Sequence, residues 1–255
     1  MNWQEIAGNW VFIPPRAVAV VHFLGGAFVA AAPQITYRHL LEQIGNAGYV
    51  IVATPFLNTF DHAEIARSVL WSFEQTMARL QATKQLRRGY LPIYGMGHSM
   101  GCKLHLLIGS LFEVERAGNI LISYNNYPAR RAIPFGEQFL PLFEVEFTPS
   151  PLETSQLVAE RYQIRRNLMI KFMDDDIDQT LSLISVLERR FPGMVALQKL
   201  PGNHLTPLSQ DINWQAGREF SPLDALAQWF RQQISRELFC LQKEILRWLN
   251  PLGTP

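Results

Sequence analysis

Residues 93–109, which read IYGMGHSMGCKLHLLIG, decide the fold of this chain. The stretch begins as a short apolar run, passes through three glycines and one serine, and continues with apolar residues at helical spacing. Gly97, Ser99 and Gly101 fit the pattern Gly-x-Ser-x-Gly, in which a strained turn between a strand and a helix lifts the serine hydroxyl above a sheet. The stretch therefore predicts a strand, a sharp turn with a projecting serine, and a helix whose N-terminus favours negative charge.

Short apolar runs alternate with longer segments of helical periodicity along the rest of the chain. We expect strands at 10–14, 17–23, 49–56, 90–97, 119–124, 167–173 and 194–200. We expect helices at 36–48, 61–80, 100–112, 179–191 and 221–249. This alternation is typical of an α/β fold with a mostly parallel central sheet and helices on both faces. We predict one domain over residues 1–255, with an insertion at about 125–160, rich in proline and aromatic residues, that forms a lid over the site.

The composition argues against several classes of function. Lysine and arginine total 23 against 22 aspartates and glutamates, a net charge of +1 without a long run of either sign, so no nucleic-acid partner is expected. Cys102 and Cys240 lie far apart without metal-ligand spacing, which predicts reduced thiols and no metal site. The N-terminus does not read as a signal peptide, and the longest apolar stretch, 17–32, is shorter than the roughly 20 residues of a membrane span. We therefore expect a cytoplasmic protein without stable membrane insertion, and the sequence leaves its oligomeric state open.

A serine at such a turn needs a base to accept its proton, and His204 has the best setting. The segment 197–208, LQKLPGNHLTPL, reads as an apolar strand followed by a turn that carries the histidine at its tip. An imidazole there is neutral enough at pH 7 to accept a proton. The remaining histidines are weaker candidates because of their positions within strands, helices or the serine turn itself: His22, His39, His62, His98 and His105.

An acid should orient the base, and the expected chain order of serine, acid and histidine places it after the strand at 167–173. Four aspartates follow that strand: Asp174, Asp175, Asp176 and Asp178. All four cannot be buried and ionised together at tolerable cost, so one turns toward the histidine while the others face water. We favour Asp175, because Ile177 two places on reads as the apolar anchor of the loop, and Asp176 is the nearest alternative.

A tetrahedral oxyanion needs two backbone donors. The first is expected to be the N–H of Met100, directly after the serine. The second is expected from the loop HFLGGAF at 22–28, with the N–H of Phe23 or Leu24 as the donor.

The strand, the HFLGG loop, the GHSMG turn, the FMDDD loop and the PGNH loop occur in an order that resembles the α/β-hydrolase superfamily. This resemblance implies a catalytic triad of Ser99, Asp175 and His204 with no metal or organic cofactor. More narrowly, YGMGHSMGCKLHLLIGSLF with PGNHLTP resembles an uncharacterised α/β-hydrolase-like family, a domain of unknown function from cyanobacteria and plants.

The sequence thus predicts a serine hydrolase that cleaves a small-molecule carboxylic ester or thioester through an acyl-enzyme. The aromatic residues of the predicted lid favour an apolar acyl group. Arg130 and Arg131 in that segment are interpreted as solvated surface residues, with contact to an anionic head group as the alternative. The alternative function is a catalytically silent binding or scaffold protein on the same fold. Labelling of Ser99 by a fluorophosphonate probe distinguishes the two.

Overall fold

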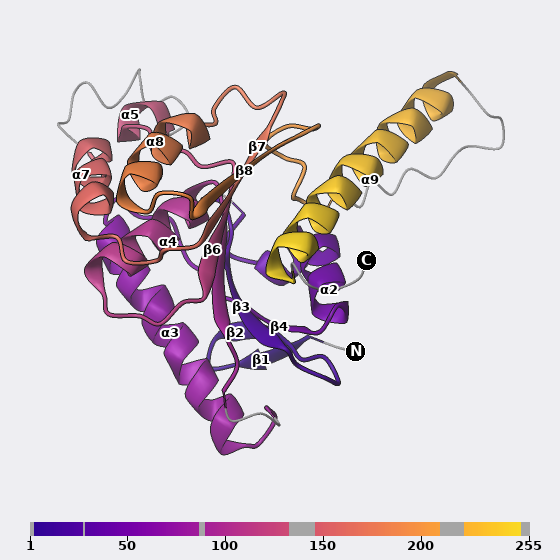
Figure 1. The fold of residues 1–255 in the computed structure, drawn as a ribbon. Coiled ribbons are helices and arrows are strands. Elements are labelled where there is room, and N and C mark those ends of the chain that lie inside the picture. Colours follow the sequence, from indigo (N-terminus) through magenta and orange to yellow (C-terminus); the bar gives the residue numbers. More distant parts are fainter. Residues whose placement is uncertain (1–2, 28, 87–89, 133–145, 210–221, 251–255) are drawn as a thin grey trace.

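The computed structural model describes residues 3–27, 29–86, 90–132, 146–209 and 222–250, with the side chains of the last helix described from residue 235 onward. Within these residues eight strands form one sheet in the order β1-β2-β4-β3-β5-β6-β7-β8 (Figure 1). The strands are β1 (Gln4–Ile6), β2 (Asn9–Phe12), β3 (Ala19–Leu24), β4 (Tyr49–Ala53), β5 (Ile93–His98), β6 (Gly118–Ile122), β7 (Asn167–Phe172) and β8 (Val195–Leu200). The pairs β1–β2 and β2–β4 are antiparallel, and every other pair is parallel. The predicted α/β fold with a mostly parallel sheet is therefore confirmed.

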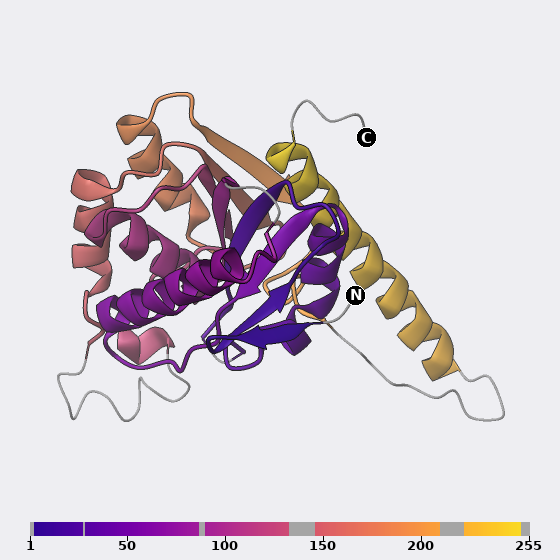
Figure 2. The same cartoon turned by 90° about the horizontal axis from the view of Figure 1, so that it is seen from below.

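Helices cover both faces of this sheet. They are α1 (Pro33–Thr36), α2 (Arg38–Asn46), α3 (His62–Ala82), α4 (Met100–Leu111), α5 (Ala129–Ala132), α7 (Pro151–Arg161), α8 (Thr180–Arg190) and α9 (Pro222–Leu249). Apolar clusters place α2 and the C-terminal part of α9 on one face and α3, α4, α7 and α8 on the other. Figures 1 and 2 show α3 and α9 on opposite sides of the sheet.

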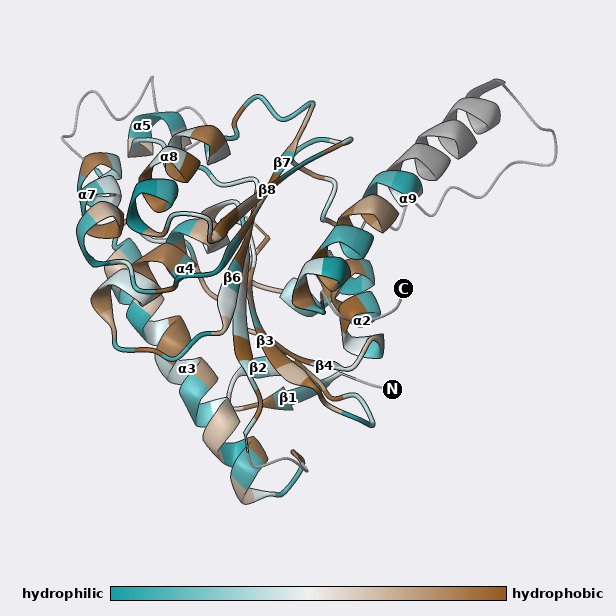
Figure 3. Ribbon diagram, viewed as in Figure 1, coloured by the Kyte–Doolittle hydropathy of each residue, from teal (hydrophilic) through white to brown (hydrophobic). Residues whose placement is uncertain are grey.

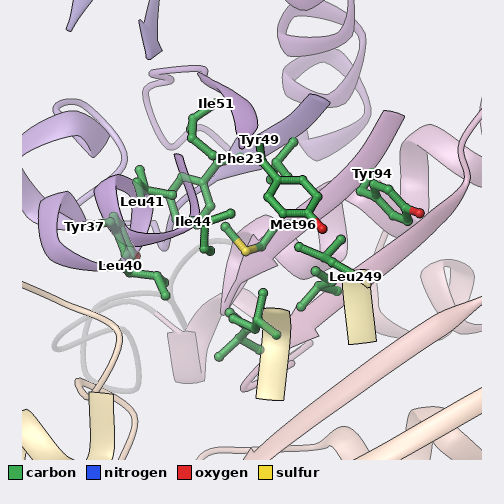
Figure 4. Packing of buried hydrophobic residues seen from close by; sticks show 14 of the residues in the cluster. Phe23, Tyr37, Leu40, Leu41, Ile44, Tyr49, Ile51, Tyr94, Met96 and Leu249 are labelled. Carbon is green, nitrogen blue, oxygen red and sulfur yellow. The ribbon is translucent and has the colours of Figure 1, made fainter. Parts of the chain in front are cut away.

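Strand β3 shows why the central strands have no polar face. All six of its residues are buried. Val21 and Phe23 pack with α2 and α9, whereas Val20 and Leu24 pack with the helices of the opposite face. A strand covered on both sides reads as a continuous apolar run, which explains its sequence and its hydrophobic colouring in Figure 3. Figure 4 shows Phe23 and Met96 of the sheet packed with residues of α2 and with Leu249 of α9.

Apolar residues spaced by three or four along 221–249 form a stripe on the C-terminal helix, and its described half packs as that stripe requires. Leu241 and Ile245 are fully buried against the sheet, and Trp248 is partly buried beneath the guanidinium of Arg166, 3.8 Å from its ring centroid. The stripe positions before residue 235 lie outside the described side chains. In the part of the chain that the structure describes, no helix combines the length and apolar character needed to cross a membrane.

The N-terminal edge and the segment predicted to be irregular differ from the sequence prediction. Strand β1 precedes the run at 10–14 that was expected to be the first strand, and the short helices α1 and α5 were not predicted. Helix α7 begins inside the predicted insertion 125–160, where Ser150 and Glu153 form a reciprocal capping box. Its Val158 is buried in the cluster shared with α4 and α8, so this end of the segment belongs to the core. Residues 133–145 of the predicted lid lie outside the described residues.

Candidate active site

Ser99 sits in the turn between β5 and α4, at the carboxyl edge of the parallel strands. Its φ of 55° and ψ of −118° lie in a region that residues other than glycine rarely adopt. A Cβ on Gly97 would come within 2.5 Å of the Gly101 backbone, and a Cβ on Gly101 would overlap the carbonyl of Leu24. The predicted crowding between strand and helix is therefore present, and it forces the serine side chain away from the sheet.

His204 follows β8 in a turn that Asn203 and Thr206 hold together. The Asn203 carboxamide oxygen accepts the Leu205 N–H at 2.9 Å, and the Thr206 hydroxyl accepts the Asn203 N–H at 2.9 Å. The acid loop is tied to this turn, because the Asp174 N–H donates to the Gly202 carbonyl at 3.0 Å. These bonds fix the two loops relative to each other at the same edge of the sheet.

Asp175 is the aspartate that the structure places against the histidine. It is 4 % exposed, and its Oδ1 accepts the Ile177 N–H at 3.2 Å. Asp174 and Asp176 are exposed. Asp178 is turned to the start of α8, where its carboxylate accepts the N–H and the hydroxyl of Thr180, both at 2.9 Å. Burial raises the pKa of Asp178, because desolvation outweighs these hydrogen bonds.

The structure brings Ser99, His204 and Asp175 into one hydrogen-bonded line. The distance is 3.0 Å from His204 Nε2 to Ser99 Oγ and 2.8 Å from His204 Nδ1 to Asp175 Oδ2. Burial acts to raise the pKa of Asp175, but its hydrogen bond to His204 and the charge interaction with that ring outweigh burial, so the pKa lies below its usual value. Because an ionised carboxylate only accepts, Nδ1 carries the proton and Nε2 presents a lone pair to the serine hydroxyl.

Asn125 is a fourth contact of the serine, and the sequence analysis missed it. Its Nδ2 donates to Ser99 Oγ at 3.1 Å, which directs the hydroxyl proton toward His204. Asn125 lies three residues after the end of β6, the strand next to β5. That position was the available signal, since polar residues just beyond neighbouring parallel strands meet at one sheet edge.

Of the residues predicted to supply backbone donors, Met100 lies at the cavity beside Ser99, whereas Phe23 and Leu24 do not. Met100 lines the same cavity as Ser99, as expected. Phe23 and Leu24 do not line it: both are fully buried in β3, whose register pairs Leu24 with Gly97 inside the sheet. The lining of the cavity therefore gives no support to the assignment of Phe23 or Leu24 as second donor. Ala27, beyond the two glycines, lines the cavity beside Ser99 and Met100.

His98, inside the serine turn, joins a buried chain of hydrogen bonds. Its pKa is lowered to about 3, mainly by burial, so the ring is neutral. The distance from His98 Nε2 to the carbonyl oxygen of His204 is 2.9 Å, and a carbonyl only accepts, so Nε2 carries the proton. Nδ1 therefore accepts from the Tyr37 hydroxyl at 2.8 Å, and that hydroxyl accepts the Gly26 N–H at 2.8 Å. The chain joins the loop after β3 to the turn that carries His204.

A cavity of about 250 Å³ opens beside the serine and the histidine. Its apolar lining includes Met100, Phe147 and Ile177, and its polar lining includes Asn125. Within the described residues, no group of three or more histidine, cysteine, aspartate or glutamate side chains is arranged to hold a metal ion.

The chain matches a family model over nearly its whole length, and solved structures share its fold. The model is described as "Protein of unknown function (DUF1350)" and matches residues 2–251. None of the curated proteins matches the chain. The butyrate-bound esterase Est2 of Thermogutta terrifontis aligns with a TM-score of 0.57 at 14% identity, over 94% of this chain and 88% of that one.

Two further solved structures align over most of both chains. The fluorophosphonate-binding serine hydrolase F of Staphylococcus aureus aligns with a TM-score of 0.55 at 14% identity, over 90% of this chain and 91% of its own. TT1662 of Thermus thermophilus aligns with a TM-score of 0.51 at 15% identity, over 91% and 98%. At these identities the likeness establishes the α/β-hydrolase fold alone.

Proposed function

This chain belongs to the DUF1350 family of unknown function, and we propose that it is a serine hydrolase cleaving a carboxylic ester or thioester. One observation carries the proposal: His204 lies 3.0 Å from Ser99 Oγ and 2.8 Å from Asp175 Oδ2, with the tautomer that a general base needs. A nucleophile activated by a base, which is in turn oriented by an acid, is the recurring arrangement of acyl transfer.

The reaction follows from the directions of these hydrogen bonds. Ser99 Oγ attacks the scissile carbonyl carbon while His204 Nε2 takes the hydroxyl proton, and Asp175 stabilises the imidazolium that forms. The carbonyl oxygen becomes an oxyanion between the N–H groups of Met100 and Ala27. His204 then gives its proton to the leaving alcohol or thiol, which departs and leaves an acyl-serine. A water molecule, deprotonated by the same nitrogen, then attacks the acyl carbon. The bond from that carbon to Ser99 Oγ breaks, the serine oxygen takes the proton back from His204, and the acid is released.

We assign the acyl group to the cavity beside Ser99. Met100, Phe147 and Ile177 supply an apolar surface for a short carbon chain. Tyr127 and Phe147 both line this cavity, which supports a lid function for part of the segment 125–160. We infer that the substrate is a small molecule, since the cavity beside Ser99 has a volume of about 250 Å³.

Fluorophosphonate labelling tests the proposal and separates it from a silent scaffold on the same fold. The wild-type protein should be labelled, and Ser99→Ala should not. His204→Ala should lower turnover of a p-nitrophenyl ester at least about a thousandfold without unfolding the chain. His39→Ala, on the exposed side of α2, is the matched control and should keep full activity. A folded wild-type protein that resists the probe would reject the hydrolase and favour the scaffold.

A further inference from the structure

Part of the cavity wall carries positively charged side chains. Lys103 and Arg131 both line the cavity, and within the described residues no aspartate or glutamate lines it. Arg131 is exposed on α5, at the segment that sequence analysis interpreted as solvated surface. The cavity that receives the substrate therefore has a net positive lining.

Lys103 is buried, which is costly for a charged side chain that lacks a partner. It is 2 % exposed, and Nζ donates to the Pro149 carbonyl at 3.1 Å. An ammonium has three donors. Among the described residues, no carboxylate oxygen lies within 4.0 Å of Nζ; Glu146 and Glu153 act on it only from a greater distance. Burial lowers the pKa of Lys103 to about 8, so it still carries its charge at neutral pH.

His62 is an independent observation that points to a polar ligand at this wall. The ring lines the cavity, is 3 % exposed, and stacks on Phe147 with ring centroids 4.2 Å apart. Neither ring nitrogen has a hydrogen-bond partner among the described residues. Buried polar side chains are rarely left unpaired, and such a group at a cavity wall points to a polar ligand.

The sequence spacing between Ser99 and Lys103 places this wall close to the nucleophile. Lys103 is four residues after Ser99, one turn into α4, so the two lie on the same side of the helix start. Phe147 is close to both polar groups, since its ring stacks on His62 and its centroid lies 5.5 Å from Lys103 Nζ. A substrate whose carbonyl is at Ser99 would place a group several atoms away beside Lys103.

We propose that the acyl group of the substrate ends in a carboxylate, which binds Lys103 and His62 deep in the cavity and Arg131 at its mouth. The substrate class is a half-ester or half-thioester of a short dicarboxylic acid. The carbon chain between the two carboxyl groups packs on Phe147 and Met100, and the distal carboxylate accepts hydrogen bonds from the ammonium and the imidazole N–H. This inference rests on the proposed hydrolase and adds the identity of its acyl group.

The first test compares two esters of equal length on the wild-type protein. Mono-p-nitrophenyl adipate carries the distal carboxylate, and p-nitrophenyl methyl adipate carries a neutral ester in its place. After subtraction of spontaneous hydrolysis, kcat/KM should favour the carboxylate about tenfold or more. Lys103→Met should lower that ratio by about tenfold, and Arg131→Met, at an exposed site that does not threaten folding, should lower it by a smaller factor. Lys199→Met, on the exposed side of β8, should leave the ratio unchanged.

A binding measurement keeps this inference separate from the proposed hydrolase. Monomethyl adipate should bind Ser99→Ala protein in isothermal titration, and Lys103→Met in that background should weaken binding about tenfold. Hydrolysis of both esters with equal kcat/KM, or no binding to Ser99→Ala protein, would overturn the carboxylate subsite and leave the hydrolase standing. Lysine-dependent binding without hydrolysis or probe labelling would support the subsite and reject the hydrolase.

Discussion

Replacing Ser99 by glycine and, separately, by alanine measures the strain held in the serine turn. The φ of 55° with a ψ of −118° costs a residue with a Cβ about 1–3 kcal/mol. Alanine keeps that Cβ and glycine removes it, at an entropic cost of about 0.5–1 kcal/mol. Neither variant has the hydroxyl that contacts His204 and Asn125, so that loss cancels between them. The glycine variant should therefore be more stable than the alanine variant by about 0.5–2 kcal/mol.

Differential scanning calorimetry of the two inactive variants gives the answer directly. For a chain of this size about 1 kcal/mol corresponds to about 2–4 °C, so Ser99→Gly should melt about 1–8 °C above Ser99→Ala. The matched control is Ser155, which is exposed within the regular helix α7. There the order reverses, and glycine should be about 1 kcal/mol less stable than alanine. A Ser99→Gly protein that melts at or below Ser99→Ala would refute the idea that this turn is strained.

Two further predictions concern the buried histidines and Tyr37. Burial lowers the pKa of His62, His98 and His105 to about 3, below the 6.5 of an exposed ring, so the unfolded chain binds protons first as the pH falls. The free energy of unfolding should therefore drop by about 2 kcal/mol per histidine ring between about pH 7 and pH 5. Urea titrations at the two pH values measure it, and an unchanged free energy would contradict the burial of these rings in their neutral form. Tyr37→Phe should lower the free energy of unfolding by about 1–3 kcal/mol and should lower kcat more than it raises KM. The control is Tyr90→Phe, at an exposed tyrosine, which should change neither. Equal kinetics in the two variants would argue against a positioning role for Tyr37.

The sheet and the serine turn could be predicted because their signals are local. Each buried strand reads as a short apolar run, and the glycines at 97 and 101 are required by contacts within a few residues or with the adjacent strand. The choice of Asp175 agrees with its placement against His204, but the reason given for it does not hold. Ile177 is 46% exposed and lines the cavity, so it does not anchor the loop in the core. What turns Asp175 inward is its pairing with the histidine.

The choice of Phe23 or Leu24 as second backbone donor depended on where β3 ends, and the sequence does not show that end. The strand continues through Leu24, and its backbone groups are engaged in the sheet: the Val20 N–H donates to Pro92 at 2.8 Å, and the Phe23 carbonyl accepts from Thr54 at 3.1 Å. Only after the two glycines does the chain reach the cavity, at Ala27. The proximity of Lys103 to Ser99 could be predicted, because a spacing of four residues places both on one side of a helix. His62 lies on another helix, α3, so only the fold brings it to the cavity.

The chain of hydrogen bonds through Tyr37 gives His98, the residue before Ser99, a structural role. Every donor direction in it is forced, because the Gly26 N–H can only donate and the His204 carbonyl can only accept. A protonated His98 would carry a second N–H at Nδ1, so the Tyr37 hydroxyl could no longer donate to that nitrogen and its proton would lose its acceptor. Burial, which lowers the pKa of His98 to about 3, keeps the ring neutral and so lets the Tyr37 hydroxyl donate to Nδ1. A neutral imidazole thus links the loop that leads to Ala27 with the turn that carries His204, so the chain fixes the position of one proposed oxyanion donor relative to the base.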